Sequence, residues 1–233
     1  MKEPERDISN KLKLVIFDLD GTLVDAYPAI IESFNFTMQK LGYPKKKGQV
    51  IRRAVGWGDE NLLRPFIKKK DLPRAISIYR EHHKKSLVRK SRLYPRVLKV
   101  LYSLKQKGLK IAIASNRPTR FTWLIVRHLG LDKYIDDVLC ADKIKYIKPH
   151  PHIINKIIQH FKVSRNECLF VGDMNIDAQA GKAAGIKTIL VARDSNTLKD
   201  FKREKPFWII RKIYDLLRIV PLFSFIHTSP EFT

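Results

Sequence analysis

Cysteine is rare in this sequence, because the 233 residues contain only Cys140 and Cys168. Both stand within apolar runs, so we expect small buried side chains rather than metal ligands or nucleophiles. Two cysteines cannot build a disulfide framework. This excludes the small disulfide-rich secreted proteins and favours a reducing compartment, the cytoplasm.

Long apolar segments are also missing. The most apolar stretch, residues 207–226, contains four charged residues and is interrupted by Pro221. A membrane span of that composition is not expected. Residues 1–13 are rich in charge and lack the apolar stretch of a signal peptide, so export is not indicated.

Acidic residues are few relative to basic ones. The chain has 23 Asp and Glu against 46 Lys and Arg, a formal net charge of +23. Such an excess favours anionic binding partners, such as phosphate esters, nucleic acid or acidic membrane surfaces. It does not distinguish among these three classes. The 44% of hydrophobic residues is ordinary for a globular protein. The length suits one large domain or a core with a smaller insert.

Short runs rich in Val and Ile recur along the chain and predict buried strands. These runs cover residues 12–17, 109–114, 138–140, 167–171, 187–191 and 207–210. Segments with helical periodicity separate most of them, at residues 96–107, 120–129, 152–161 and 178–184. This alternation predicts an α/β fold, a doubly wound, Rossmann-like parallel sheet with helices on both faces.

One part of the chain breaks the alternation. Residues 25–91 contain helical patterns at 29–41, 60–70 and 75–88 and no convincing strand. They predict a small helical domain inserted after the first strand. The core would then be discontinuous, formed by residues 1–24 and 92–220, with a C-terminal tail at 221–233. Per residue, the insert is more basic than the core.

Four carboxylates gather at two predicted strand ends. The first strand ends in FDLDGTLVD, with Asp18 and Asp20, and a later strand ends in VGDMNID, with Asp173 and Asp177. In an open parallel sheet the carboxyl ends of the strands form the ligand crevice. Like charges brought so close need a cation or a shared proton. Mg²⁺ fits best, because it combines a few carboxylates with water and substrate phosphate.

Two weaker signals lie between these carboxylates. Ser115 and Asn116 follow the strand KIAIA, and Lys148 precedes the helix that begins after KPHP. Alone, each is typical of a turn, a cap or a solvated loop. In this order, FDLDGTLVD, IASN, KPHP and GDMNID resemble the haloacid dehalogenase-type phosphatase superfamily, in particular its phosphoglycolate phosphatase-like branch. The resemblance extends from about residue 12 to residue 217, and the family's helical cap matches the predicted insert.

The resemblance implies a role for each carboxylate. Asp18 would be the nucleophile that accepts the phosphoryl group, and Asp20 the general acid and base. Mg²⁺ would be held by Asp18, the backbone carbonyl of Asp20 and Asp173, with Asp177 supporting the site. A carboxylate nucleophile divides hydrolysis into two easier displacements, which agrees with these roles.

The remaining candidate residues follow from the same resemblance. Ser115 and Asn116 would bind the substrate, and Lys148 would offset the charge of the transferring phosphoryl group. In the insert, Arg53, Gly56 and Trp57 would form a loop that approaches the substrate. The neighbouring pair His82 and His83 is expected to be solvated. Arg96 stands where the family commonly has glycine, which affects a local turn rather than the chemistry.

These observations predict an Mg²⁺-dependent phosphatase that hydrolyses a small phosphorylated metabolite, such as phosphoglycolate, through an aspartyl-phosphate. A phosphomutase of the same superfamily is an alternative, because it can share every core motif. A nucleic-acid-binding protein or a polynucleotide end phosphatase is another, favoured by the charge. We expect a cytoplasmic monomer or homodimer with no membrane contact and only weak, non-specific binding to nucleic acid.

Overall fold

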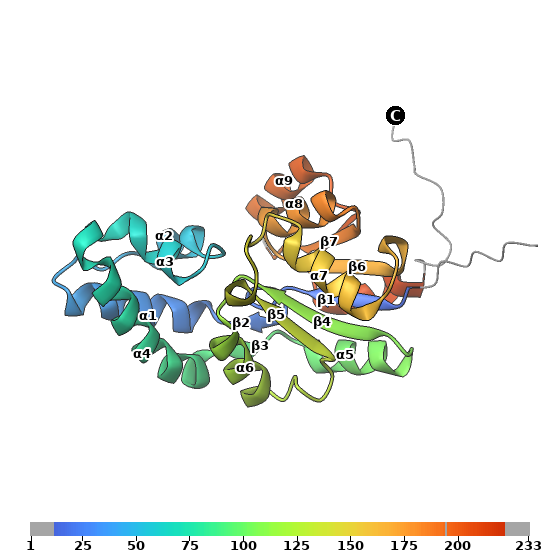
Figure 1. The fold of residues 1–233 in the computed structure, drawn as a ribbon, viewed down its shortest axis with the longest axis horizontal. Helices are drawn as coiled ribbons and strands as arrows, with labels where there is room; N and C mark the ends of the chain where they lie inside the picture. The colour runs from blue at the N-terminus through green and yellow to red at the C-terminus, as the bar shows by residue number, and fades with distance from the viewer. Residues whose placement is uncertain (1–11, 194, 222–233) are drawn as a thin grey trace, which may run out of the picture.

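The computed structural model describes residues 12–193 and 195–221 (Figure 1). Apart from its first residue, the predicted C-terminal tail lies outside the described residues. The centre of the fold is a six-stranded sheet with the order β5-β4-β1-β6-β7-β8, and every neighbouring pair is parallel. Its strands are β1 (Leu14–Phe17), β4 (Lys110–Ser115), β5 (Asp137–Cys140), β6 (Cys168–Gly172), β7 (Lys187–Val191) and β8 (Trp208–Ile210). The predicted doubly wound α/β fold is therefore confirmed.

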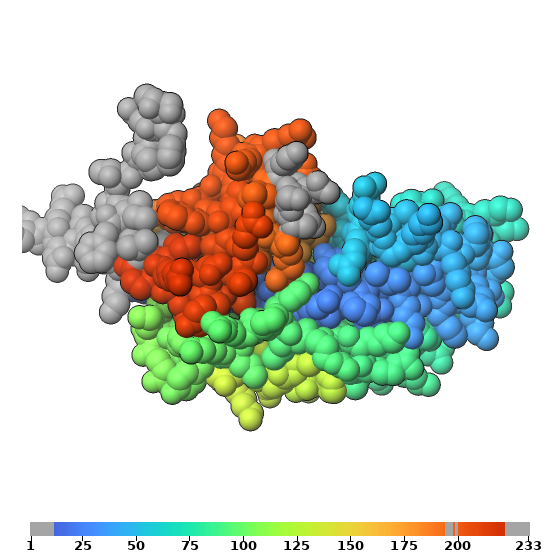
Figure 2. Space-filling model, turned by 180° about the vertical axis from the view of Figure 1, so that it is seen from behind, coloured from blue at the N-terminus to red at the C-terminus, as the bar shows by residue number. Residues whose placement is uncertain are grey.

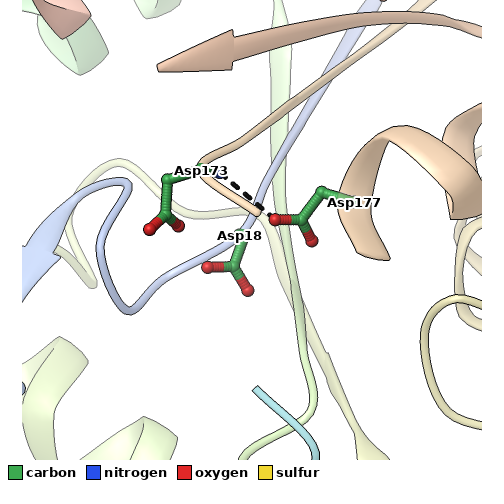
Figure 3. Close-up of side chains that lie close together, drawn as sticks. All are labelled: Asp18, Asp173 and Asp177. Carbon is green, nitrogen blue, oxygen red and sulfur yellow. Dashed lines mark hydrogen bonds between the residues drawn. The ribbon is translucent and has the colours of Figure 1, made fainter. Parts of the chain in front are cut away.

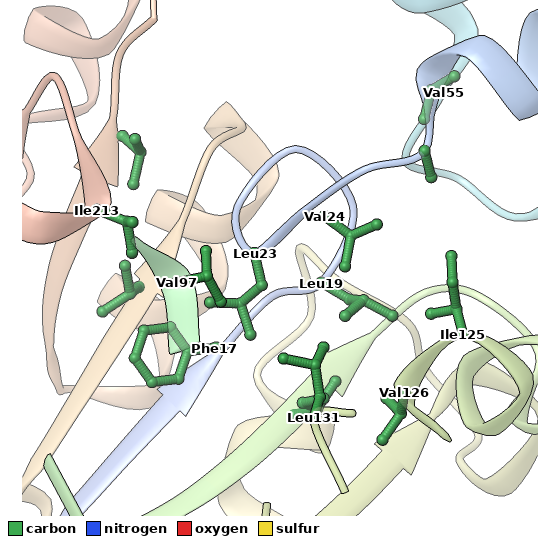
Figure 4. Packing of buried hydrophobic residues seen from close by; sticks show 14 of the residues in the cluster. Phe17, Leu19, Leu23, Val24, Val55, Val97, Ile125, Val126, Leu131 and Ile213 are labelled. Atoms are coloured by element: carbon green, nitrogen blue, oxygen red, sulfur yellow. The ribbon is translucent and has the colours of Figure 1, made fainter. Parts of the chain in front are cut away.

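Alternating side chains of β1 build a core on both faces of the sheet. Val15 and Phe17 belong to the larger apolar cluster, part of which appears in Figure 4, and Leu14 and Ile16 belong to a second one. The first face is covered by α5 (Val97–Gln106), α6 (Thr119–His128) and α10 (Leu216–Ile219). The second is covered by α7 (His152–Phe161), α8 (Asn175–Ala184) and α9 (Ser195–Glu204). Because the strand is buried on both sides, it reads as a continuous apolar run.

The order of the strands places the switch point at β1. From β1 the chain builds outward through β4 to β5 and then crosses to β6, β7 and β8 on the other side. The loops that follow β1, β4 and β6 therefore meet at one edge of the sheet. This edge is the expected position of a ligand crevice.

The segment at residues 26–91 is mostly helical and lies beside the sheet (Figure 1). Its helices are α1 (Tyr27–Lys40), α2 (Gly48–Ala54), α3 (Asp59–Leu63) and α4 (Leu72–Lys90). Figure 2 shows the same arrangement from behind, with these helices in blue to teal and the C-terminal part of the core in orange to red. The division of the chain into two domains stays a prediction. None of the helices among the described residues combines the length and the apolarity that crossing a membrane requires.

The structure of this segment and its edges differs from the expectations in two ways. A short antiparallel pair, β2 (Val24–Asp25) and β3 (Arg92–Leu93), occurs where no strand was expected. The helix expected at 60–70 is divided into α3 and two 3₁₀ turns, at Arg64–Phe66 and Lys69–Asp71. Pro65 explains the first break, because its ring removes a backbone donor and clashes with the preceding helical turn.

Candidate active site

A pocket lies where the carboxyl ends of the central strands meet the inserted helices. The core contributes most of its polar lining, namely Asp18, Asp20, Ser115, Asn116, Arg117, Lys148 and Asp177. The insert contributes apolar side chains together with Asp59, Tyr79 and His83. The pocket therefore joins a charged floor to a partly apolar wall.

The centre of the floor is an ion-paired triad of one lysine and two aspartates. Lys148 Nζ donates hydrogen bonds to Asp18 Oδ1 at 2.6 Å and to Asp177 Oδ1 at 2.7 Å. Its third donor reaches the carbonyl of Ala114, at the end of β4, at 2.9 Å. All three side chains of the triad are buried. The lysine, a weak signal in the sequence, is thus fully engaged between two of the predicted carboxylates.

A third carboxylate completes an acidic cluster beside this lysine (Figure 3). Carboxylate oxygens of Asp18, Asp173 and Asp177 all lie within 4.8 Å of one another. The other oxygen of Asp177 accepts hydrogen bonds from the backbone N–H groups of Asp173 and Met174, at 3.2 and 3.0 Å. These bonds close the first turn of α8 and fix the cluster. Hard oxygen donors in this arrangement fit a divalent cation such as Mg²⁺.

The charges of the cluster are only partly balanced. Burial, together with the charge of Asp177, raises the pKa of Asp18 to about 7, although Lys148 opposes this shift. Burial and the two neighbouring carboxylates raise the pKa of Asp173 well above its usual range. The pKa of Lys148 would be lowered by burial, but Asp177 and Asp18 outweigh this effect and raise it. Without a further cation, the cluster therefore favours partial protonation.

The turn after β1 fits closely around Asp173. Gly21 has a φ of +90°, and a Cβ at this position would lie 1.9 Å from Asp173 Oδ2. Only glycine satisfies both conditions. Thr22 Oγ1 donates to Asp173 Oδ1 at 2.9 Å, and the Tyr27 hydroxyl lies 3.5 Å from Oδ2. The DGT sequence of the first motif thus shapes the space for the third carboxylate.

Asp20 lines the same pocket but its carboxylate is not part of the acidic cluster. Arg117 binds it through two parallel hydrogen bonds, from Nε to Oδ2 at 2.8 Å and from Nη2 to Oδ1 at 2.7 Å. Both side chains are largely shielded from solvent, with exposed fractions of 6% for Arg117 and 16% for Asp20. This two-point geometry fixes the carboxylate in orientation as well as in position.

Ser115 and Asn116 follow β4 directly into the pocket. The amide of Asn116 donates to the carbonyls of Gly56, at 2.8 Å, and Lys148, at 3.0 Å, and its oxygen accepts the backbone N–H of Lys148. Ser115 Oγ accepts the backbone N–H of Arg117 at 3.2 Å. Asn116 therefore connects the insert, the β4 loop and the lysine loop.

The inserted loop only partly matches its prediction. Gly56 lines the pocket, whereas Arg53 and Trp57 do not line it and are exposed. The structure thus brings together Asp18, Asp20, Ser115, Asn116, Lys148, Asp173, Asp177 and Gly56, and leaves the other two candidates at the surface.

Arg117 and His83, like Asp59 and Tyr79, are charged or titratable residues of the pocket that were missed or misread from the sequence. Arg117 directly follows the IASN motif, so its position was a usable signal. His83 was expected to be solvated but is only 2% exposed. Its spacing from Tyr79 and Leu87 places it on the buried stripe of α4, and a count at helical intervals could have found it.

The chain is similar to known proteins over most of its length. The family model for haloacid dehalogenase-like hydrolases matches residues 15–191. A phosphoglycolate phosphatase of Vibrio parahaemolyticus is 30% identical over 219 residues, which cover 90% of this chain and 96% of that protein. A phosphoglycolate phosphatase of Aquifex aeolicus is 28% identical, with 86% of this chain and 96% of that protein covered.

Solved structures give a similar picture. The crystal structure of a predicted phosphoglycolate phosphatase from Haemophilus somnus superposes with a TM-score of 0.85 at 27% identity. The match covers 89% of this chain and 97% of that one. The two folds therefore correspond over most of the length of both chains.

Proposed function

This chain belongs to the haloacid dehalogenase-like hydrolase family, and we propose that it is a metal-dependent phosphatase acting on a small phosphomonoester, with phosphoglycolate as the first candidate. The observation that carries the proposal is the Asp18 carboxylate, buried at the floor of a pocket and held by Lys148 at 2.6 Å. The names of the relatives support the phosphatase activity and the choice of the first substrate.

Asp18 is the nucleophile of the proposed reaction. Its carboxylate attacks phosphorus, the bond to the leaving oxygen breaks, and an aspartyl-phosphate forms. Lys148 donates to the same carboxylate, so its charge is close to the phosphoryl group throughout the transfer. Ser115, at the end of β4, also lines the pocket and can donate its hydroxyl to a phosphoryl oxygen.

Asp20 is the general acid and base of the proposed reaction. In the first step it gives a proton to the leaving oxygen, and in the second it takes one from the water that attacks the aspartyl-phosphate. The products are the alcohol and inorganic phosphate, and Asp18 is regenerated. Arg117 keeps the Asp20 carboxylate oriented toward the pocket that both reactants share.

Asp18 and Asp173 are the proposed protein ligands of a divalent cation, and Asp177 supports them from the first turn of α8. When bound, Mg²⁺ would neutralise negative charge on the carboxylates and on the phosphoryl oxygens. The raised pKa values of Asp18 and Asp173 support this assignment, because they reflect a cluster that one lysine does not neutralise.

Removal of the metal should silence the enzyme without unfolding it. We expect dialysis against a chelator to abolish phosphate release and added Mg²⁺ to restore it. Asp173→Ala should raise the Mg²⁺ concentration needed for half-maximal activity at least about tenfold. Phosphate release and circular dichroism measure the two properties separately. Full activity after exhaustive chelation would refute the metal requirement.

The competing polynucleotide function can be tested at about 150 mM salt, where charge on an exposed surface is screened beyond roughly 8 Å. We expect kcat/KM for phosphoglycolate to exceed that for 5′- or 3′-phosphorylated oligonucleotides at least about a hundredfold, because the insert lines one side of the pocket. A preference for an oligonucleotide would overturn the substrate class. Transfer of phosphate within a sugar phosphate, without release, would instead identify a phosphomutase.

A further inference from the structure

His83 connects the inserted helices to the proposed acid and base. It lies on α4, is 2% exposed, and its Nε2 is 3.0 Å from Nη1 of Arg117. Arg117 comes from the loop after β4, and its Nε and Nη2 donate to Asp20. A continuous chain of contacts thus runs from His83 in the insert through Arg117 to Asp20, in the loop after β1, and ends in the pocket.

The contacts define the protonation state of this histidine. A guanidinium has only donors, so Nε2 must accept the hydrogen bond and carries no proton. The proton then sits on Nδ1, which is 3.2 Å from Ser33 Oγ. The hydroxyl of Ser33 in turn donates to the carbonyl of Ala29 at 2.8 Å. Burial and the charge of Arg117 lower the pKa of His83 well below its usual value, in agreement with a neutral ring.

Packing holds the ring in place as well. The ring of His83 stacks on Tyr79 with centroids 4.8 Å apart and meets the edge of Phe121, of α6, at 5.5 Å. Tyr79 belongs to the same helix and is also buried. The imidazole therefore has little freedom to turn away from the guanidinium.

Arg117 needs such a partner. Its side chain is long, and in a buried setting an unpaired N–H group is costly. The fork toward Asp20 uses Nε and Nη2, which leaves Nη1 to be satisfied by another acceptor. Without one, the guanidinium is free to rotate toward water or toward other oxygens of the pocket. The two parallel bonds to Asp20 would then lose their alignment.

We propose that His83 is a positioning residue for the phosphatase reaction, which holds Arg117 in the plane that aligns Asp20 with the substrate. The inference rests on the proposed role of Asp20 as acid and base. Because His83 comes from α4, this role connects the insert to the chemistry. Asp20 is then fully aligned only when α4 lies against the loop after β4. Substrate binding, by contrast, does not need His83.

A pair of nearly isosteric variants separates this hydrogen bond from packing. His83→Gln keeps an acceptor oxygen for Arg117, whereas His83→Met fills a similar volume without one. With phosphoglycolate and saturating Mg²⁺, we expect His83→Met to lower kcat by about 10- to 100-fold, a part of what acid–base catalysis contributes, with KM changed less than about threefold. His83→Gln should recover kcat to within about fivefold of the parent.

His82→Met is the matched control. His82 is the next residue of α4 and also contacts Ser33 Oγ, at 3.1 Å, but it stacks on Phe36 and does not reach Arg117. Its kcat should stay within about twofold of the parent. If His83→Met and His83→Gln lose the same activity, or if neither loses any, the positioning role is refuted.

Two more variants keep the test decisive. Ser33→Ala leaves the ring in place but removes the acceptor of its Nδ1 proton, and should lower kcat to a smaller degree with KM unchanged, even if the His83 variants fail to fold. An unchanged kcat for Ser33→Ala in that case would refute the role. Asp20→Asn tests the premise that Asp20 is the general acid and base. Full activity of this variant would refute that role. Its inactivity beside a fully active His83→Met would refute the positioning role alone.

Discussion

Asp18→Asn is expected to lower phosphate release at least about a thousandfold, because an amide cannot accept the phosphoryl group. The loss should appear in kcat for every phosphomonoester tested. Asp132→Asn, an exposed carboxylate between α6 and β5, is the matched control and should retain parental activity. Turnover of the folded Asp18→Asn protein within about tenfold of the parent would end the assignment of the nucleophile.

The same variant makes a prediction for stability in chelator. The pKa of Asp18 is raised from 3.8 to about 7 in the folded protein, mainly by burial, so the folded state binds the proton more tightly than the unfolded state does. The parent should therefore lose stability as the pH rises from about 4 to about 7, by up to roughly 1.4 kcal/mol per pH unit. Asp18→Asn removes this loss, and its Tm should exceed that of the parent by more at pH 8 than at pH 5. A pH-independent difference in Tm would contradict the raised pKa of the buried Asp18 carboxyl.

The second large effect is expected at Lys148. Lys148→Met leaves Asp18 and Asp177 buried without their shared cation. Breaking a buried ion pair on one side costs about 3–5 kcal/mol. For a chain of this size, in chelator near pH 8, that corresponds to a fall in Tm of roughly 10 °C. Loss of the charge beside the phosphoryl group should also lower kcat at least about a hundredfold.

A double variant separates the two consequences of this change. Lys148→Met with Asp177→Asn removes one buried charge of each sign, so part of the lost Tm should return while kcat stays low. Saturating Mg²⁺ should likewise reduce the Tm difference, because the ion replaces the missing positive charge. A single Lys148→Met variant with the Tm and kcat of the parent would show that the lysine neither stabilises the cluster nor assists transfer.

Local sequence was sufficient for the sheet and for the cluster. The runs that became β1, β4 and β6 are apolar on both faces, and the polar residues at their ends, Asp18, Ser115 and Asp173, follow at once. A carboxylate at the end of a buried strand is costly to desolvate unless a cation or another partner binds it. The pattern therefore indicated a site at these strand ends. Lys148 needed the resemblance, since a lysine before proline is ordinary on its own.

The parts that were not predicted involve contacts between segments distant in the sequence. The ion pair between Asp20 and Arg117 joins residues 97 positions apart, and no local pattern marks it. His83 was misread because its neighbours in sequence, Glu81 and Lys84, are charged, whereas its neighbours in space are aromatic. Helix α9 was missed since its sequence is dominated by polar residues and offers few apolar side chains, such as Leu198 and Phe201, to the core.

The antiparallel pair of β2 and β3 makes the segment between them, residues 26–91, suited to exchange as a unit. Val24 lies opposite Leu93 and Asp25 opposite Arg92, so the 66 residues between Asp25 and Arg92 leave and rejoin the core at adjacent points. Adjacent antiparallel ends are what a two-residue hairpin turn can bridge. We therefore expect this position to tolerate inserted segments of different lengths at a small difference in loop-closure cost. Exchange of residues 26–91 at this pair of strands should therefore replace one wall of the pocket and leave Asp18 and Asp173 in place.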